Sequence, residues 1–184
     1  MIKRELYMNR IRPFIGGELI KVMTGIRRSG KSVMLELIKE ELAEAGVAPS
    51  QMISINFEDM RYSHLQTATA LHDEIIKRAE GIEGKAYLFF DEIQEVEGWE
   101  KCVNSLRVAL DCDIYITGSN AKLLSGELAT YIGGRYVEFV IYPFSFGEFM
   151  ELYRSISPDA SIQQCFQKYL LAGGMPYLAN LRYA

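Results

Sequence analysis

The stretch Gly25-Ile-Arg-Arg-Ser-Gly-Lys-Ser32 decides the fold of this chain. It matches the pattern G-x-x-x-x-G-K-[ST] at every fixed position. The short, mainly apolar run Leu19–Thr24 before it predicts a buried strand, and apolar residues at helical spacing predict a helix over Lys31–Ala45. Strand, glycine-bearing loop and helix in this order are the context in which the pattern wraps a nucleotide diphosphate.

The chemistry of phosphate binding explains the spacing within this loop. Gly25 and Gly30 keep side chains away from the backbone N–H groups that face the phosphates, and the following helix adds the positive end of its dipole. We expect Lys31 to place its charge on the β- and γ-phosphates of ATP and Ser32 to give its hydroxyl to Mg²⁺. The residues expected to bind ATP are Gly25, Arg28, Ser29, Gly30, Lys31 and Ser32.

A second pattern, Tyr87-Leu-Phe-Phe-Asp-Glu92, places two carboxylates directly after an apolar run. Ligands of open α/β sheets sit at the carboxyl edge, where such a strand ends. Asp91 is therefore predicted to be the magnesium partner, and Glu92 to orient and deprotonate an attacking water. The alternative for Glu92 is a solvated acid that starts a loop. No Asn-Lys-x-Asp guanine signature occurs in the sequence, which favours ATP over GTP.

Strand-like and helix-like stretches alternate along most of the chain. This alternation predicts an α/β fold, a P-loop NTPase three-layer sandwich with a mainly parallel five-stranded sheet, followed by a small helical lid. The expected strands are Leu19–Thr24, Met52–Phe57, Ala86–Phe90, Asp113–Thr117 and Tyr136–Ile141. The expected helices are Lys31–Ala45, Leu65–Ala79, Trp99–Leu110, Ala121–Tyr131, Phe146–Arg154 and Ile162–Leu171. We expect an ATPase domain over residues 1–142, then the lid and the start of a truncated C-terminal region over 143–184.

The composition favours a soluble protein of the cytoplasm. Of the 184 residues, 49% are hydrophobic and 24% are charged, which suits a packed core. The three cysteines form no C-x-x-C pair, so a reducing cytosol fits better than a disulfide framework or a zinc site. The N-terminus carries no apolar signal-peptide core, and no run reaches the roughly 20 apolar residues of a membrane helix. We therefore expect a cytoplasmic location and no membrane partner.

The charge of the chain is uneven. The net charge of −4 argues against a surface that binds nucleic acid all over. Residues 1–40 nevertheless hold nine Lys and Arg against four Glu. A basic segment of this kind could hold the phosphates of a small ligand or those of DNA. For Lys3, Arg4 and Arg10 we expect ordinary solvated surface positions.

Several motifs together resemble the AAA+-type prokaryotic ATPases in which such a domain precedes a poorly characterised C-terminal region. They are the phosphate loop, Phe89–Gln94 (FFDEIQ), Thr117–Ser125 (TGSNAKLLS), Gly133–Tyr136 (GGRY) and Tyr142–Phe149 (YPFSFGEF). The resemblance covers nearly the whole chain and is most specific at Pro143–Phe149. It implies a five-stranded sheet with the phosphate-loop strand near its centre, a helical lid, and a complete protein of about twice this length.

Further site residues follow from this resemblance. In AAA+ proteins a polar residue at the end of the fourth strand senses the γ-phosphate, and here Ser119 and Asn120 both fit. The alternative for either is a helix N-cap. Arg135, just before the fifth strand, lies where AAA+ proteins often keep an arginine that reaches the γ-phosphate of a neighbouring subunit. Its alternative is a surface arginine after a turn.

We expect a Mg²⁺-dependent ATPase that converts ATP to ADP and phosphate and acts as a switch or motor on a macromolecular partner. Glu92 and Arg135 favour this over a small-molecule kinase, which must exclude water. An interaction module whose ATP state carries the signal, with little turnover, is the other alternative. DNA or a protein, contacted through residues beyond this chain, and a homo-oligomer are all compatible with the sequence.

Overall fold

The computed structural model describes residues 2–119 and 132–176. Its centre is a five-stranded sheet in the order β2-β3-β4-β1-β5, and each neighbouring pair of strands is parallel. The strands are β1 (Ile20–Thr24), β2 (Met52–Asn56), β3 (Ala86–Asp91), β4 (Cys112–Thr117) and β5 (Tyr136–Val140). This confirms the predicted fold class. The phosphate-loop strand β1 is internal, between β4 and β5.

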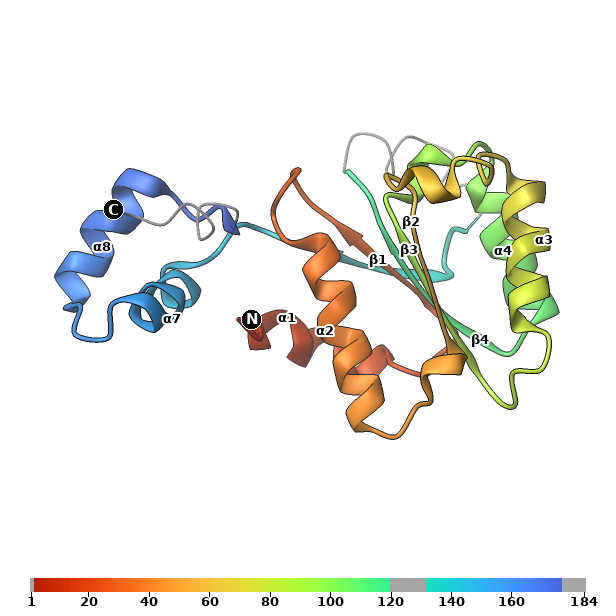
Figure 1. The fold of residues 1–184 in the computed structure, drawn as a ribbon, viewed down its shortest axis with the longest axis horizontal. Coiled ribbons are helices and arrows are strands. Elements are labelled where there is room, and N and C mark those ends of the chain that lie inside the picture. The colour runs from red at the N-terminus through yellow and green to blue at the C-terminus, as the bar shows by residue number, and fades with distance from the viewer. Residues whose placement is uncertain (1, 120–131, 177–184) are drawn as a thin grey trace.

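Helices cover both faces of the sheet and complete three layers (Figure 1). On one face lie α1 (Glu5–Ile11) and α2 (Lys31–Glu44), and on the other lie α3 (Ala68–Ala79) and α4 (Trp99–Ala109). Along β3, Leu88 and Phe90 join the α3–α4 core while Phe89 joins the α1–α2 core. This alternation follows from the period of two along a strand. None of the described helices is long and apolar enough to cross a membrane.

Short elements connect these layers. The 3₁₀ helices are η1 (Arg12–Phe14), η2 (Pro49–Gln51), η3 (Met60–Tyr62) and η4 (Ile93–Glu95). Helix α3 begins at Ala68, three residues later than expected, because the Thr67 side chain accepts a hydrogen bond from the backbone N–H of Ala70 and so caps the helix. The helix predicted over Ala121–Tyr131 lies outside the described residues.

Helix α1 is an element that the sequence analysis did not predict. Its Tyr7, Met8 and Ile11 side chains are buried in the core between the sheet and α2. A helix of seven residues is too short to produce a clear periodic pattern, and a segment of this length is not stable in isolation. Packing against the sheet therefore decides its conformation.

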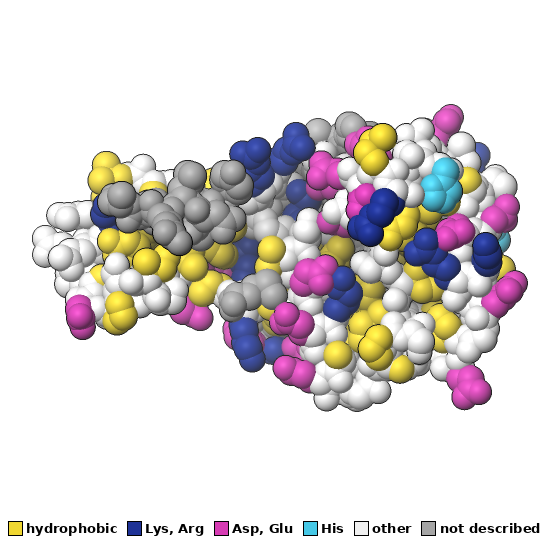
Figure 2. All heavy atoms as spheres, viewed as in Figure 1, with side chains coloured by type: hydrophobic (Ala, Val, Ile, Leu, Met, Phe, Trp, Pro, Cys, Tyr) yellow, Lys and Arg dark blue, Asp and Glu magenta, His cyan; other side chains and the backbone are white. Residues whose placement is uncertain are grey.

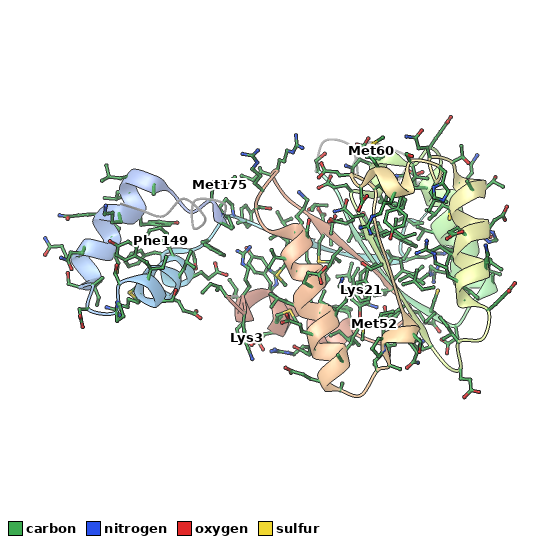
Figure 3. The ribbon with its side chains drawn as sticks, viewed as in Figure 1. Lys3, Lys21, Met52, Met60, Phe149 and Met175 are labelled. Carbon is green, nitrogen blue, oxygen red and sulfur yellow. The ribbon has the colours of Figure 1, made fainter. Side chains whose placement is uncertain are left out.

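The last two described helices, α7 (Phe146–Ile156) and α8 (Ile162–Ala172), lie at one end of the molecule, apart from the sheet, and pack on each other (Figure 1). Each starts with a capping box, Ser145 with Glu148 and Ser161 with Gln164. The ring of Phe149 on α7 and that of Tyr169 on α8 have centres 5.2 Å apart. Phe149 is labelled in Figure 3. We call α7 and α8 the helical pair.

A buried ion pair anchors the amino end of the sheet. The side chains of Lys21 and Asp113 are fully buried and hydrogen-bonded to each other, and Figure 3 shows Lys21 within the body that contains the sheet. Asp113 also accepts hydrogen bonds from the Tyr115 hydroxyl and the Gly16 backbone N–H, each at 2.7 Å. Burial lowers the pKa of Lys21, and its attraction to Asp113 opposes this effect.

Lys21→Met is expected to lower the free energy of unfolding by about 3–5 kcal/mol, because it leaves the Asp113 carboxylate buried without its charge partner. Chemical denaturation measures this loss. The double variant Lys21→Met/Asp113→Asn removes both charges and should recover much of the stability. An equal or larger loss in the double variant would show that the unpaired charge is not the cause.

Candidate functional site

The phosphate loop connects the carboxyl end of β1 to the start of α2, as predicted. Gly25 has φ 146°, and a Cβ atom there would lie 2.3 Å from the carbonyl oxygen of Ile141, so no larger residue fits. Gly30 precedes α2 in a left-handed conformation with φ 100°. Arg28 is also left-handed, with φ 66°. The loop therefore holds a backbone shape that depends on its glycines.

The N-terminus of α2 opens at this loop without a side-chain cap. Gly30 cannot cap it, and the first turn contains no acidic residue. The first N–H groups of a helix have no partner within the helix and carry the positive end of its dipole. Ser32 is exposed in this first turn. The arrangement favours an anion at the start of α2.

Lys31 and Glu92 meet inside the site. The Lys31 side chain is only 4% exposed, and its Nζ lies 3.5 Å from Glu92 Oε1. The same Nζ lies 3.4 Å from the carbonyl oxygens of Gly25 and Ile26. Glu92 has a left-handed backbone with φ 55°, and its other carboxylate oxygen accepts a hydrogen bond from Gln94. The Glu92 side chain thus faces the phosphate loop.

Polar residues at the ends of neighbouring strands, at the carboxyl edge of the sheet, hydrogen-bond to Asp91 and Glu92. The Asp91 carboxylate accepts hydrogen bonds from the Thr117 hydroxyl at the end of β4 and from the Asn56 amide at the end of β2. Thr117 also accepts the backbone N–H of Glu92 at 3.0 Å. Sequence analysis did not single out Thr117. Its signal was a polar residue that ends an apolar strand adjacent to the strand of Asp91.

A cleft of about 640 Å³ opens at this edge. One side is polar and comes from the phosphate loop, Glu58 and Glu92, and the other comes from the N-terminal segment and the region of the helical pair. It is lined by Ile2, Arg4, Arg27, Arg28, Gly30, Lys31, Ser32, Val33, Glu58, Glu92, Phe144, Leu152 and Pro176. Figure 2 shows basic side chains gathered where the helical pair meets the body that contains the sheet. The cleft therefore combines positive charge with an apolar wall.

Arg4 is not a solvated surface residue, contrary to our expectation. It is 2% exposed, and its guanidinium donates to the carbonyl oxygen of Ser29 and to the carboxylate of Glu148. These partners lie 25 and 144 residues away in sequence. A charge count over a short segment contains no information about partners so distant. Arg27, by contrast, is exposed, and its side chain pairs with Glu58 at 3.2 Å.

The other predicted residues lie at different places. Ser119 follows Gly118 at the end of β4, on the same edge as the cleft, and is half-buried. Asn120 lies outside the described residues. Arg135 lies at the opposite, amino edge of the sheet, where its carbonyl oxygen accepts the N–H of Ile20 and its guanidinium donates to Asn104 at 2.7 Å. The fold thus separates Arg135 from the phosphate loop of its own chain.

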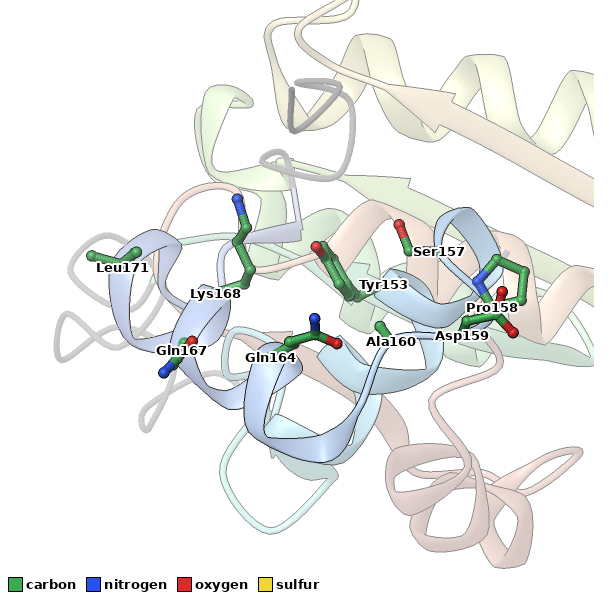
Figure 4. A pocket seen from close by; sticks show the side chains of 9 residues that line it. All are labelled: Tyr153, Ser157, Pro158, Asp159, Ala160, Gln164, Gln167, Lys168 and Leu171. Carbon is green, nitrogen blue, oxygen red and sulfur yellow. The ribbon is translucent and has the colours of Figure 1, made fainter.

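A second hollow, of about 480 Å³, lies at the helical pair (Figure 4). Tyr153 of α7 and Gln164 and Lys168 of α8 are among the side chains that line it. It contains none of the residues predicted for ATP, Mg²⁺ or catalysis. The larger cleft at the phosphate loop, which contains several of them, is the candidate site.

Curated relatives show where the chain stands among known proteins. An uncharacterized protein of Haemophilus influenzae is 43% identical over 176 residues, which are 96% of this chain and 44% of that protein. An uncharacterized protein of Methanocaldococcus jannaschii is 36% identical over 166 residues, which are 85% of this chain and 35% of that protein. The chain therefore spans less than half the length of these relatives.

Solved structures share its fold. The Orc1 protein of Aeropyrum pernix in complex with DNA superposes with a TM-score of 0.61 at 15% identity, covering 86% of this chain and 50% of that one. AMPPCP-bound DnaA from Aquifex aeolicus superposes with a TM-score of 0.54 at 15% identity, covering 98% and 65%. Residues 18–150, most of the chain, match the family model described as AAA domain, and the chain belongs to this family of AAA+-type ATPases.

Proposed function

We propose that this chain binds ATP with Mg²⁺ in the cleft at the phosphate loop and hydrolyses it to ADP and phosphate. The observation that carries the proposal is the convergence of Lys31, the open start of α2, Asp91 and Glu92 at one edge of the sheet. The AAA-domain family supports nucleotide binding, and the residues of this cleft support hydrolysis.

The polar side of the cleft suits a triphosphate. The N–H groups of the loop and of the first turn of α2 donate to the β-phosphate, and Lys31 shifts from Glu92 to the β- and γ-phosphates. Arg28, which lines the cleft, provides further positive charge near the phosphates. The buried Ser29 hydroxyl has no hydrogen-bond partner among the described residues, an exception of the kind that occurs at ligand sites. On the other side, Phe144, Leu152 and Pro176 offer an apolar surface to the base.

The donor set also suits Mg²⁺. Hard cations of this size take carboxylate, hydroxyl and water oxygens. Asp91 offers a carboxylate whose two oxygens are already oriented by Thr117 and Asn56, and Ser32 offers an exposed hydroxyl at the start of α2. Asp91 and Ser32 would hold Mg²⁺ there, and the ion would supply positive charge that offsets the negative charge developing on the phosphates.

Glu92 carries the hydrolytic step in this proposal. Its carboxylate takes a proton from water as the water oxygen attacks the γ-phosphorus, and the bond between the γ-phosphorus and the bridging oxygen breaks to release ADP. The hydrogen bond from the Glu92 N–H to Thr117 fixes the backbone from which this carboxylate extends. Ser119 or Asn120 would sense the γ-phosphate at the end of β4.

The partner belongs to the proposal as well. A motor or switch acts on a macromolecule, and the Orc1 structure with the same fold is a complex with DNA. We propose DNA or a protein as the partner class and the cytoplasm as the compartment. A homo-oligomer would bring the Arg135 of one copy to the cleft of another.

Lys31→Ala is expected to weaken binding of ATP with Mg²⁺ at least about tenfold, because charge-assisted hydrogen bonds of this kind contribute about 1.5–3 kcal/mol. Isothermal titration calorimetry of the wild type and of Lys31→Ala measures this difference in affinity. Lys39→Ala is a matched control, since Lys39 lies on the same helix but pairs with Glu36 outside the cleft. Equal affinities of the wild type and Lys31→Ala would overturn the assignment of the phosphate loop.

A further inference from the structure

Arg4 joins three separate parts of the chain at the rim of the cleft. Its guanidinium donates to the carbonyl oxygen of Ser29 in the phosphate loop at 2.9 Å and to that of Tyr142 after β5 at 2.8 Å. It also donates to the Glu148 carboxylate in the first turn of α7 at 2.8 Å. The Arg4 side chain is 1% exposed, and its guanidinium carbon lies 4.6 Å from the centre of the Tyr7 ring and 5.2 Å from that of Phe144. Such enclosure holds the guanidinium in one place.

Glu148 has two roles at the other end of this contact. Its carboxylate accepts the backbone N–H of Ser145 at 2.8 Å, which caps α7, and it pairs with Arg4. Burial alone would raise the pKa of Glu148, but hydrogen bonds from Arg4 and Ser145 outweigh burial and hold the pKa below its ordinary value. The orientation of α7 is thus connected to the position of Arg4.

Arg4 also lies directly against the phosphate loop. A Cβ atom on Gly30 would lie 3.3 Å from Arg4 Nη1, so the guanidinium packs against the residue that precedes Lys31. A shift of Ser29 or Gly30 must either move Arg4 or break its hydrogen bond. One side chain therefore connects the phosphate loop to α7.

We propose that Arg4 and Glu148 form a latch that couples nucleotide occupancy of the phosphate loop to the position of the helical pair. The inference rests on the proposed binding of ATP in the same cleft. Arg4 is a positioning residue for the loop, and Glu148 acts through Arg4. The guanidinium suits this task because its planar fork serves the loop carbonyl and the carboxylate at once, which an ammonium group does less well. Coupling between two sites is reciprocal, so breaking the latch at α7 changes ATP affinity.

Glu148→Gln tests the latch at its partner residue, because Glu148, unlike Arg4, does not line the cleft. Glutamine is accepted at this position of a capping box, so α7 keeps its cap while Arg4 loses its charge partner. Arg4→Met keeps a long side chain next to the rings of Tyr7 and Phe144 but loses the hydrogen bonds. We expect each variant to bind a hydrolysis-resistant ATP analogue about tenfold more weakly than the wild type, within the usual range of coupling between sites.

The double variant Arg4→Met/Glu148→Gln distinguishes coupling from separate structural damage. If Glu148 acts through Arg4, adding Glu148→Gln to Arg4→Met causes no further loss of affinity. Arg12→Met is the matched control. Arg12 lies in the same N-terminal segment and bridges Glu5 and Glu41 at 2.8 and 2.9 Å, but does not contact the phosphate loop. The Arg12→Met variant should bind the ATP analogue with the affinity of the wild type.

Hydrogen exchange gives the reciprocal measurement. The analogue should slow amide exchange at the start of α7 in the wild type and in Arg12→Met, but not in Arg4→Met. Additive losses in the double variant, or wild-type affinity in both single variants, would overturn the latch while ATP binding stands. If the wild type binds no ATP, the proposed function itself fails and the latch fails with it. Circular dichroism confirms that the compared variants are folded.

Discussion

Mixing Arg135→Ala with Glu92→Gln is expected to restore ATP hydrolysis that neither variant shows alone. Arg135 lies at the amino edge of the sheet, whereas the phosphate loop leaves the carboxyl edge, because β1 and β5 run parallel. It therefore cannot serve the cleft of its own chain and would act on that of a neighbour. In a mixed oligomer, a subunit with intact Glu92 receives the arginine of a Glu92→Gln neighbour.

The expected size of this effect is large. Arginines supplied in trans to P-loop enzymes contribute about 10³–10⁵ in rate. Arg135→Ala should lower turnover by a factor of that order, spare ATP binding, and abolish the rise of specific activity with protein concentration. Phosphate release from purified protein across a concentration series measures both effects.

The control for Arg135 is Arg107→Ala. Arg107 is on α4, the helix whose Asn104 pairs with Arg135, and it bonds to the carbonyl oxygen of Glu18 at 3.4 Å. The Arg107→Ala variant should hydrolyse ATP as fast as the wild type does. No rescue at concentrations where mixed oligomers are shown to form would mean that Arg135 supports structure rather than catalysis in a neighbour. The experiment belongs on the longest form of the protein, since its relatives extend well beyond the matched region.

Glu92→Gln is expected to lower turnover by about 10²–10⁴-fold and to leave ATP binding nearly unchanged. Glutamine fills the same space and can hydrogen-bond water, but it cannot take the proton. The substitution also frees Lys31, whose Nζ lies 3.5 Å from the Glu92 carboxylate, to meet the phosphates. Single-turnover hydrolysis with saturating protein separates the chemical step from binding.

Glu95→Gln, three residues further along the chain on an exposed position, is the control for charge loss near the site. It should retain wild-type turnover. If Glu92→Gln hydrolyses ATP as fast as the wild type, another group is the base. If the wild type instead transfers phosphate to a small acceptor, the kinase alternative replaces hydrolysis. If it binds ATP with no turnover at all, the chain is a nucleotide-dependent interaction module.

Local patterns in the sequence were sufficient for the framework of the molecule. The motif Gly25–Ser32, the apolar strands and the helical spacing after Lys31 predicted the parallel sheet, and the structure confirms it. These features are readable because a phosphate loop and a buried strand depend on residues adjacent in sequence. The positions of Lys31, Asp91 and Glu92 at one edge followed from the same reasoning, since parallel strands end on the same side.

Long-range packing decided the rest. The sequence predicted Arg4 to be a surface residue, but the fold buries it against Ser29 and Glu148. Thr117 contacts Asp91 only because β4 pairs with β3. Helix α1 forms because the core accepts its apolar face. The separation of Arg135 from its own phosphate loop follows from the parallel pairing of β1 with β5. The sequence by itself determined which candidate site residues the chain carries and on which strands and loops they lie. The tertiary structure decided which other residues hold them in place, because such contacts join residues far apart along the chain.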